Sequence, residues 1–128
     1  MRSLSLKKRE KEEHLNFQVK FSGIIPEIAD LIKTGDIAKN MEGRMIGQVK
    51  SIISNKPVEF RALSSKDNEY VTISNSFQKD IVAILDLTCE EKNGVLYFKD
   101  YPIKVGSMLI FATDLYSVNG TITGLENK

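Results

Sequence analysis

The chain has 128 residues, a length that fits one domain, and 41% of them are hydrophobic, which is enough for a real core. A formal net charge of +1 excludes a large field that would attract nucleic acid or an anionic membrane. The longest apolar run, 81–87, is too short to cross a membrane, and no apolar stretch of a signal peptide follows the charged N-terminus. The single cysteine, Cys89, cannot form an internal disulfide, so the cysteine content does not indicate whether the protein works in an oxidising or a reducing compartment.

The first third of the chain predicts a tail, a strand and a helix. Residues 1–14 are rich in charge and lack apolar periodicity, so we expect a flexible charged tail followed by a single domain over 15–126. Apolar and polar residues alternate over 17–21, which predicts a strand with one buried face. Pro26 can begin a helix, and we expect a helix of about two turns that stops at Gly35.

The middle of the chain predicts further strands. Residues 37–53 predict a hairpin followed by a long strand. Pro57 allows an edge position or a bend, and weak alternation over 58–63 indicates another strand. After a polar loop we expect a short strand at 70–73. The polar segment 74–80 is expected to be a loop or a helical turn.

The last third predicts strands separated by turns. The segment 81–89 is rich in β-favouring residues, and Asn93-Gly94 is the strongest hairpin signal, because that turn needs positive φ at both central residues. We then expect a strand over 108–113, a turn over 114–119 and a closing strand.

One short sequence motif occurs twice in the chain, and we call it the repeated phrase. Ile32-Lys33-Thr34-Gly35-Asp36 and Ile103-Lys104-Val105-Gly106-Ser107 are each followed by a turn and by a strand that begins with glycine. Two units of this size cannot each close a core, but they can pack about a pseudo-twofold axis. We therefore predict a mainly β fold, a small closed or partly open β-barrel from two pseudo-twofold repeats, with one short α-helix.

The turns of the repeat are Gly35-Asp36 and Gly106-Ser107, and we predict that both are structural. Gly35-Asp36 resembles the Gly-Asp turn of cradle-loop β-barrels, where the aspartate usually accepts hydrogen bonds from backbone N–H groups. An aspartic dyad would need a second acid at the symmetric position, and Ser107 cannot share a proton with Asp36 in that way.

Other motifs for catalysis or for a bound group are not found in the sequence. His14 is the only histidine and lies in or beside the expected tail, and the spacing of a zinc site and a phosphate-binding glycine loop are both missing. Cys89 is predicted to be a core residue. The hairpin tip 41–45 is placed like that of lipoyl and biotinyl carrier domains but has no lysine to modify. We predict no catalytic residue, no metal ligand and no cofactor.

Aromatic residues beside basic ones mark a candidate partner surface. Its members are Phe60, Arg61, Tyr70, Phe77 and Lys79. Small barrels often bind single-stranded nucleic acid through such residues. The competing interpretation places the rings in the core and the lysine in solvent, and the near-zero net charge favours it, so nucleic acid is not the expected partner.

The order of several short motifs resembles the DUF4330 family of bacterial proteins. The segments that carry the resemblance are 17–28, 32–36, 46–49, 102–107 and 116–122. The resemblance implies a non-enzymatic domain of unknown role, usually held outside the cytoplasmic membrane by one N-terminal helix. That helix is missing here, so we expect a shortened form or a soluble member, with a membrane contact only through the missing anchor.

Together these features predict a non-catalytic binding or assembly module of the bacterial cell envelope, with a protein or glycan partner. The first alternative is a cytoplasmic small barrel that binds nucleic acid. The second is an enzyme that uses carboxylates such as Asp36, Asp86 or Asp114, which requires two of them to converge in a pocket. The sequence leaves the partner's identity and the oligomeric state open.

Overall fold

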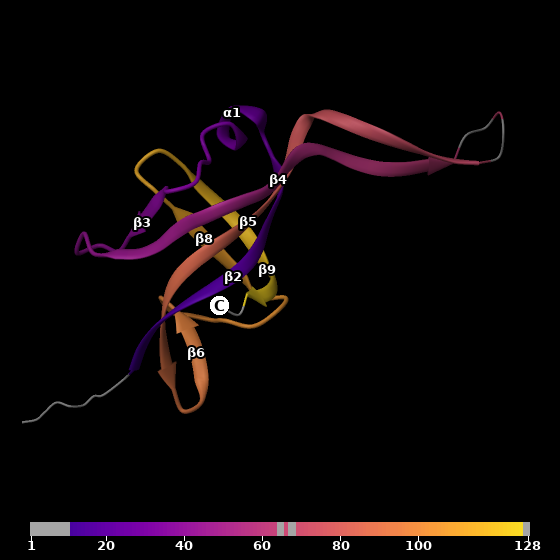
Figure 1. Ribbon diagram of the computed structural model, residues 1–128. Coiled ribbons are helices and arrows are strands. Elements are labelled where there is room, and N and C mark those ends of the chain that lie inside the picture. Colours follow the sequence, from indigo (N-terminus) through magenta and orange to yellow (C-terminus); the bar gives the residue numbers. More distant parts are fainter. Residues whose placement is uncertain (1–10, 64–65, 67–68, 127–128) are drawn as a thin grey trace, which may run out of the picture.

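A computed structural model describes residues 11–63, 66 and 69–126 (Figure 1). Most of these residues lie in strands of one sheet. The elements are β2 (Lys11–Ile24), α1 (Pro26–Ala29), β3 (Ile37–Lys39), β4 (Met45–Leu63), β5 (Tyr70–Lys92), β6 (Val95–Phe98), β7 (Tyr101–Pro102), β8 (Met108–Ala112) and β9 (Ser117–Glu126).

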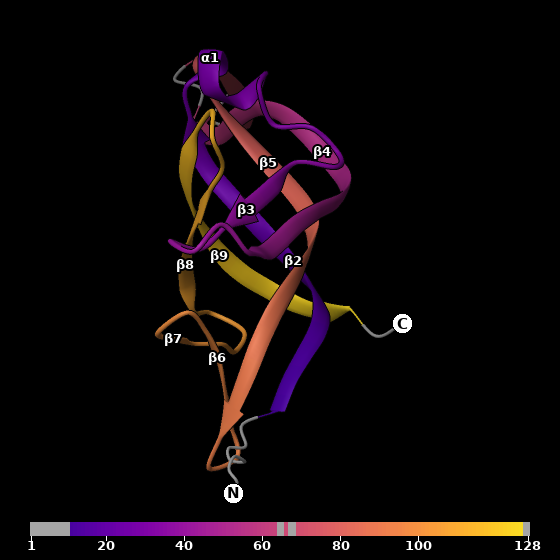
Figure 2. The ribbon, with the colours of Figure 1, turned by 90° about the vertical axis from the view of Figure 1, so that its left-hand side faces the viewer.

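The sheet curls into a barrel that is nearly closed. Its strand order is β3-β4-β5-β2-β9-β8, with β6 paired to the end of β5 and to β7. The terminal strands β3 and β8 approach each other but share no ladder within the described part of the chain, which leaves one unsealed seam (Figure 2). The predicted mainly β, partly open barrel with one short helix is confirmed.

The strand order is symmetric. Exchanging β2 with β5, β3 with β8 and β4 with β9 gives the same strand order, read from the opposite edge of the sheet. The repeated phrase folds in the same way in both halves, because Gly35 N–H donates to Val49 O at 2.8 Å and Gly106 N–H donates to Ile122 O at 2.7 Å. The halves are interleaved, since β4 pairs with β5 and β9 pairs with β2.

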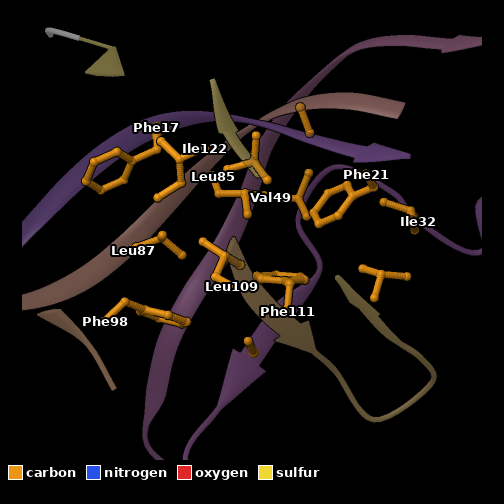
Figure 3. Packing of buried hydrophobic residues seen from close by; sticks show 14 of the residues in the cluster. Phe17, Phe21, Ile32, Val49, Leu85, Leu87, Phe98, Leu109, Phe111 and Ile122 are labelled. Carbon is orange, nitrogen blue, oxygen red and sulfur yellow. The ribbon is translucent and has the colours of Figure 1, made fainter. Parts of the chain in front are cut away.

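One face of the strands supplies the core. Phe17, Val19 and Phe21 point inward from β2, as their alternation predicts, and are 3%, 0% and 0% exposed. Phe98 and Phe111 enter from the other half, and the Phe21 and Phe111 ring centroids lie 6.5 Å apart (Figure 3). The buried set of the described residues contains no polar or charged residue, so burial of apolar surface stabilises the barrel.

Two glycines in equivalent strands let the backbone approach the core closely. A Cβ atom at Gly120 would lie 2.5 Å from Val19 Cγ1 and 2.7 Å from Phe21 Cε1, and one at Gly47 would lie 3.2 Å from Leu87 Cδ2. Neither glycine has a positive φ. Core packing, not turn geometry, therefore explains glycine at these two positions.

Several local predictions are settled by the backbone. The Asn93-Gly94 turn is confirmed, with φ angles of 53° and 81°. The helix is shorter than predicted, because α1 ends at Ala29 and the chain continues through tight turns such as Leu31 N–H to Ile28 O. Gly35 is thus not a helix stop; it takes a φ of 97° in the turn of the repeat.

Three boundaries also differ from the expectations. β2 begins at Lys11, so residues 11–14 pair with β5 and belong to the sheet, while residues 1–10 lie outside the described residues. The segment 74–80 is part of β5, so the expected loop or helical turn is wrong. β9 begins at Ser117, so the expected turn over 114–119 ends earlier.

Candidate functional site

The outer parts of β4 and β5 leave the barrel as a two-stranded ribbon (Figure 1). The last residue of β2 to pair with β5 is Ile24, which lies opposite Lys79, so β5 has only β4 as a partner further out in the described residues. We call residues 58–63 and 70–75 the arm. An isolated two-stranded ribbon is marginally stable in water, so an arm of this kind gains from further contacts.

The arm has one apolar face. Residues that pair directly across an antiparallel ladder point to the same side, and Phe60 pairs with Ile73 while Ala62 pairs with Val71. The apolar face consists of Val58, Phe60, Ala62, Val71 and Ile73, and Asn75, opposite Val58, is its one polar residue. Phe60, Val71 and Ile73 are 50%, 45% and 39% exposed, so no described residue covers this face.

The opposite face of the arm is mostly polar. It consists of Glu59, Arg61, Leu63, Tyr70, Thr72 and Ser74. Successive residues of a strand point to opposite sides, so the two faces follow directly from the register of β4 on β5. We call this set the polar face.

A bulge separates the arm from the barrel. The register passes from Val58 opposite Asn75 to Pro57 opposite Lys79, which leaves residues 76–78 without partners in β4. Phe77 lies in this bulge, is 81% exposed, and its N–H donates to Asn75 Oδ1 at 2.9 Å. Pro57 therefore combines the edge position and the bend that it allows in the sequence.

The predicted partner surface does not form one patch. Phe60 belongs to the apolar face, Arg61 and Tyr70 to the polar face, and Phe77 to the bulge. Lys79 lies at the base of the arm, where its Nζ is 3.2 Å from Asp30 Oδ1. The aromatic rings of this set are exposed and do not fill the core. The prediction missed the aliphatic members of the apolar face, which only the pairing of both strands brings together.

The Gly35-Asp36 turn joins the two repeats. Asp36 Oδ2 accepts hydrogen bonds from Lys33 N–H at 2.8 Å and from the hydroxyl of Tyr116, which precedes β9. The pKa of Tyr116 is raised, mainly because its hydroxyl is buried and also because the carboxylate of Asp36 lies beside it. In the second copy, Ser107 N–H donates to Lys104 O, but the Ser107 hydroxyl finds no partner among the described residues.

The histidine lies on the barrel, which the sequence did not predict. His14 is in β2, and its Nδ1 is 3.3 Å from Thr88 Oγ1 and 3.8 Å from Asp86 Oδ1. Both contacts use the same ring nitrogen, whereas a catalytic triad uses one nitrogen for the nucleophile and the other for the acid. Asp86 Oδ1 accepts no hydrogen bond from the described residues.

The remaining chemical groups are separate. Asp36 contacts Tyr116 and Lys33, whereas Asp86 lies beside His14. Within the described ranges, no group of three or more His, Cys, Asp and Glu could hold a metal ion. Cys89 is fully buried, and burial raises the pKa of its thiol to about 12. Of the helices in this part of the chain, none has the length and apolar character needed to cross a bilayer.

Comparison with models of known protein families, with curated proteins and with solved structures gave no match. The resemblance to the DUF4330 family therefore stays a prediction.

Proposed function

We propose that this chain is a non-catalytic binding or assembly module whose barrel presents the arm to a protein partner. The observation that carries the proposal is the uncovered apolar face, which projects from a barrel whose own core is already complete. Large exposed apolar patches on soluble proteins usually mark interaction sites. The barrel acts in this proposal as the support from which β4 and β5 project, and the ion pair of Lys79 with Asp30 lies at the base of the arm.

The chemistry of the apolar face favours a protein over a glycan or a nucleic acid. The face has a single ring, Phe60, and no charged side chain, so it offers few hydrogen bonds to sugar hydroxyls and no cation for a phosphate. Arg61 lies on the other face, and Lys79 is already paired. An apolar, uncharged protein surface is the partner that complements this face.

The cell-envelope location is a separate part of the proposal. Its support is the resemblance of residues 17–125 to a bacterial family that is usually anchored outside the cytoplasmic membrane. Fractionation of the organism's cells with an antibody against the chain tests it. Recovery with the cytosol alone would contradict this part and leave the proposal for the arm intact.

Site-specific photo-crosslinking in the source cells tests the proposal for the arm. A photoreactive amino acid replaces Phe60 on the apolar face, and the matched control replaces Glu59, its neighbour on the polar face. We expect one discrete adduct with another protein from position 60 and little from position 59. Adding Ile73→Asp, which puts a charge opposite position 60, should abolish the adduct while circular dichroism stays unchanged. Equal adducts at both positions, or none, would contradict the proposal.

A further inference from the structure

The arm has two free edges, and they differ in composition. On β4, the ladder with β3 covers only Met45–Gln48, so the arm's outer edge of β4 is unpaired within the described residues. On β5, the ladder with β2 stops at Lys79, so the outer edge over 70–75 is also unpaired there. A strand edge with free N–H and C=O groups is a template for another strand.

The β4 edge carries features that hinder pairing with another strand. Lys56, Glu59 and Arg61 place charges along it, and Pro57 has no N–H to donate. The β5 edge has none of these features. Its residues Tyr70-Val71-Thr72-Ile73-Ser74-Asn75 are uncharged, contain no proline or glycine, and favour extended structure.

We propose that the β5 edge of the arm pairs antiparallel with the same edge of a second copy, and that the chain is a twofold dimer through Tyr70–Asn75. The inference concerns the edge of the arm and goes beyond the partner of its apolar face. The two arms would then form one ribbon of four strands, which satisfies the backbone groups of both edges. Because the β4 edges are hindered and the bulge at 76–78 interrupts the ladder, assembly stops at two copies.

The faces of the arm determine the register of this pairing. Antiparallel partners share a face, so the apolar residues of both copies stay on one side only if a residue, not a peptide bond, lies on the twofold axis. With Thr72 on the axis, Val71 of one copy lies opposite Ile73 of the other, and Tyr70 lies opposite Ser74. A β-branched pair and a threonine pair then meet across the interface, both of which stabilise sheets.

Charge explains why a second copy is a suitable occupant. Pairing about a twofold axis brings each residue near its own equivalent, so a charge near the axis would repel itself. No residue in 70–75 is charged, and Glu69, the first charged residue beyond them, falls opposite the amide of Asn75. An axis at Thr72 also places the two barrels at opposite ends of the shared ribbon, because each barrel begins beyond Lys79.

Self-association is measured first, by light scattering and sedimentation on the full chain over a range of concentrations. We expect a discrete species of twice the chain mass. Thr72→Lys places like charges on the axis and should weaken the dimer about tenfold or more. The matched control Glu59→Lys changes the same face on the β4 edge and should leave the dimer intact. A monomer at all concentrations, or a dimer lost only in Glu59→Lys, would overturn the inference.

A charge exchange separates a specific interface from a loss of folding. Thr72→Glu alone should also weaken the dimer, because it too repels itself on the axis. A mixture of Thr72→Lys and Thr72→Glu chains should recover a heterodimer, since opposite charges then face each other. Failure of the mixture to associate, while both variants keep the wild-type circular dichroism, would count against the twofold axis at Thr72.

Cysteine cross-linking tests the register. Directly paired Cα atoms lie about 4.5–5.5 Å apart, within the reach of a disulfide, so Thr72→Cys should cross-link under mild oxidation. Ser74→Cys should not, because its equivalents would be about 13 Å apart along the strands. The native Cys89 is buried and does not compete. Efficient cross-linking of Ser74→Cys, or of neither variant, would overturn the register. Loss of the dimer would leave the Phe60 cross-link to another protein unaffected, so the two proposals fail separately.

Discussion

Replacing Gly120 by alanine tests whether glycine at this position is required by core packing. The added methyl group would lie 2.5 Å from Val19 Cγ1 and 2.7 Å from Phe21 Cε1, well inside the usual contact distance of about 3.5–4 Å. Neither neighbour can turn away easily, because both side chains are 0% exposed and Val19 is β-branched. The core must therefore shift.

Overpacking of this kind lowers the free energy of unfolding by about 1–3 kcal/mol. For a domain of this size, each kcal/mol corresponds to a fall in Tm of roughly 3–6 °C, so we expect a drop of several degrees or more. Urea denaturation followed by far-UV circular dichroism measures the change, which is suitable because the chain contains no tryptophan.

Two glycines in equivalent or neighbouring positions serve as graded controls. Gly124 lies in the same strand as Gly120, but a Cβ atom there meets only Gln18 Cβ at 3.9 Å, so Gly124→Ala should change stability by less than about 0.5 kcal/mol. Gly47→Ala, with its nearest contacts at 3.2 Å, should fall between the two. Val19→Ala removes the closest contact, so combining it with Gly120→Ala should cost less than the sum of the two single changes. Equal effects of Gly120→Ala and Gly124→Ala would refute the packing argument.

Two further predictions concern buried groups. Tyr116→Phe should lower the free energy of unfolding by about 1.5–3 kcal/mol, because it removes a hydrogen bond to the carboxylate of Asp36. Since the folded state raises the pKa of Tyr116 above the ordinary 10.0, its contribution is full below that pH and is lost as the pH rises further. Urea midpoints should therefore fall less steeply at alkaline pH in Tyr116→Phe than in the wild type, and equal slopes would contradict this assignment. Because burial raises the thiol pKa of Cys89 to about 12, little reactive thiolate is present near pH 8. Cys89 should therefore react with a disulfide reagent on the order of 10³-fold more slowly in the folded chain than in urea. Equal rates would show that the thiol is accessible in the folded chain.

The barrel is predictable from the sequence where each strand has one buried face. Phe17, Val19 and Phe21 alternate because only their side of β2 meets the core, and the repeat appears as a phrase because the same turn occurs twice. The segment 74–80 has no such signal, because none of the side chains that the structure describes there enters the core. Its Asn75 and Ser76 favour turns, and the extended backbone is fixed by long-range pairing on both sides of the bulge, of 74–75 with β4 and of Lys79 with β4 and β2.

The candidate site was predictable only in part, for a similar reason. Phe60 and Arg61 are neighbours in the sequence, but adjacent residues of a strand point to opposite faces, so they cannot belong to one patch. Phe60 instead shares a face with Ile73, a relationship set by the register of two strands across a loop. The contact of Tyr116 with Asp36 joins residues 80 positions apart and has no local signal in either segment.

The interleaving of the two repeats has a consequence for how the protein is made. The last strand, β9, pairs with the first, β2, and supplies Ile122 to the core, so the barrel cannot close before residues 117–126 have left the ribosome. Until then the edge of β2 that pairs with β9 has no partner, while its other edge can pair with β5 once β5 has been synthesised. Pairings between the two ends of a chain fold slowly and leave such edges exposed to other molecules. The open edge of β2 therefore stays available to other molecules during synthesis until residues 117–126 can pair with it.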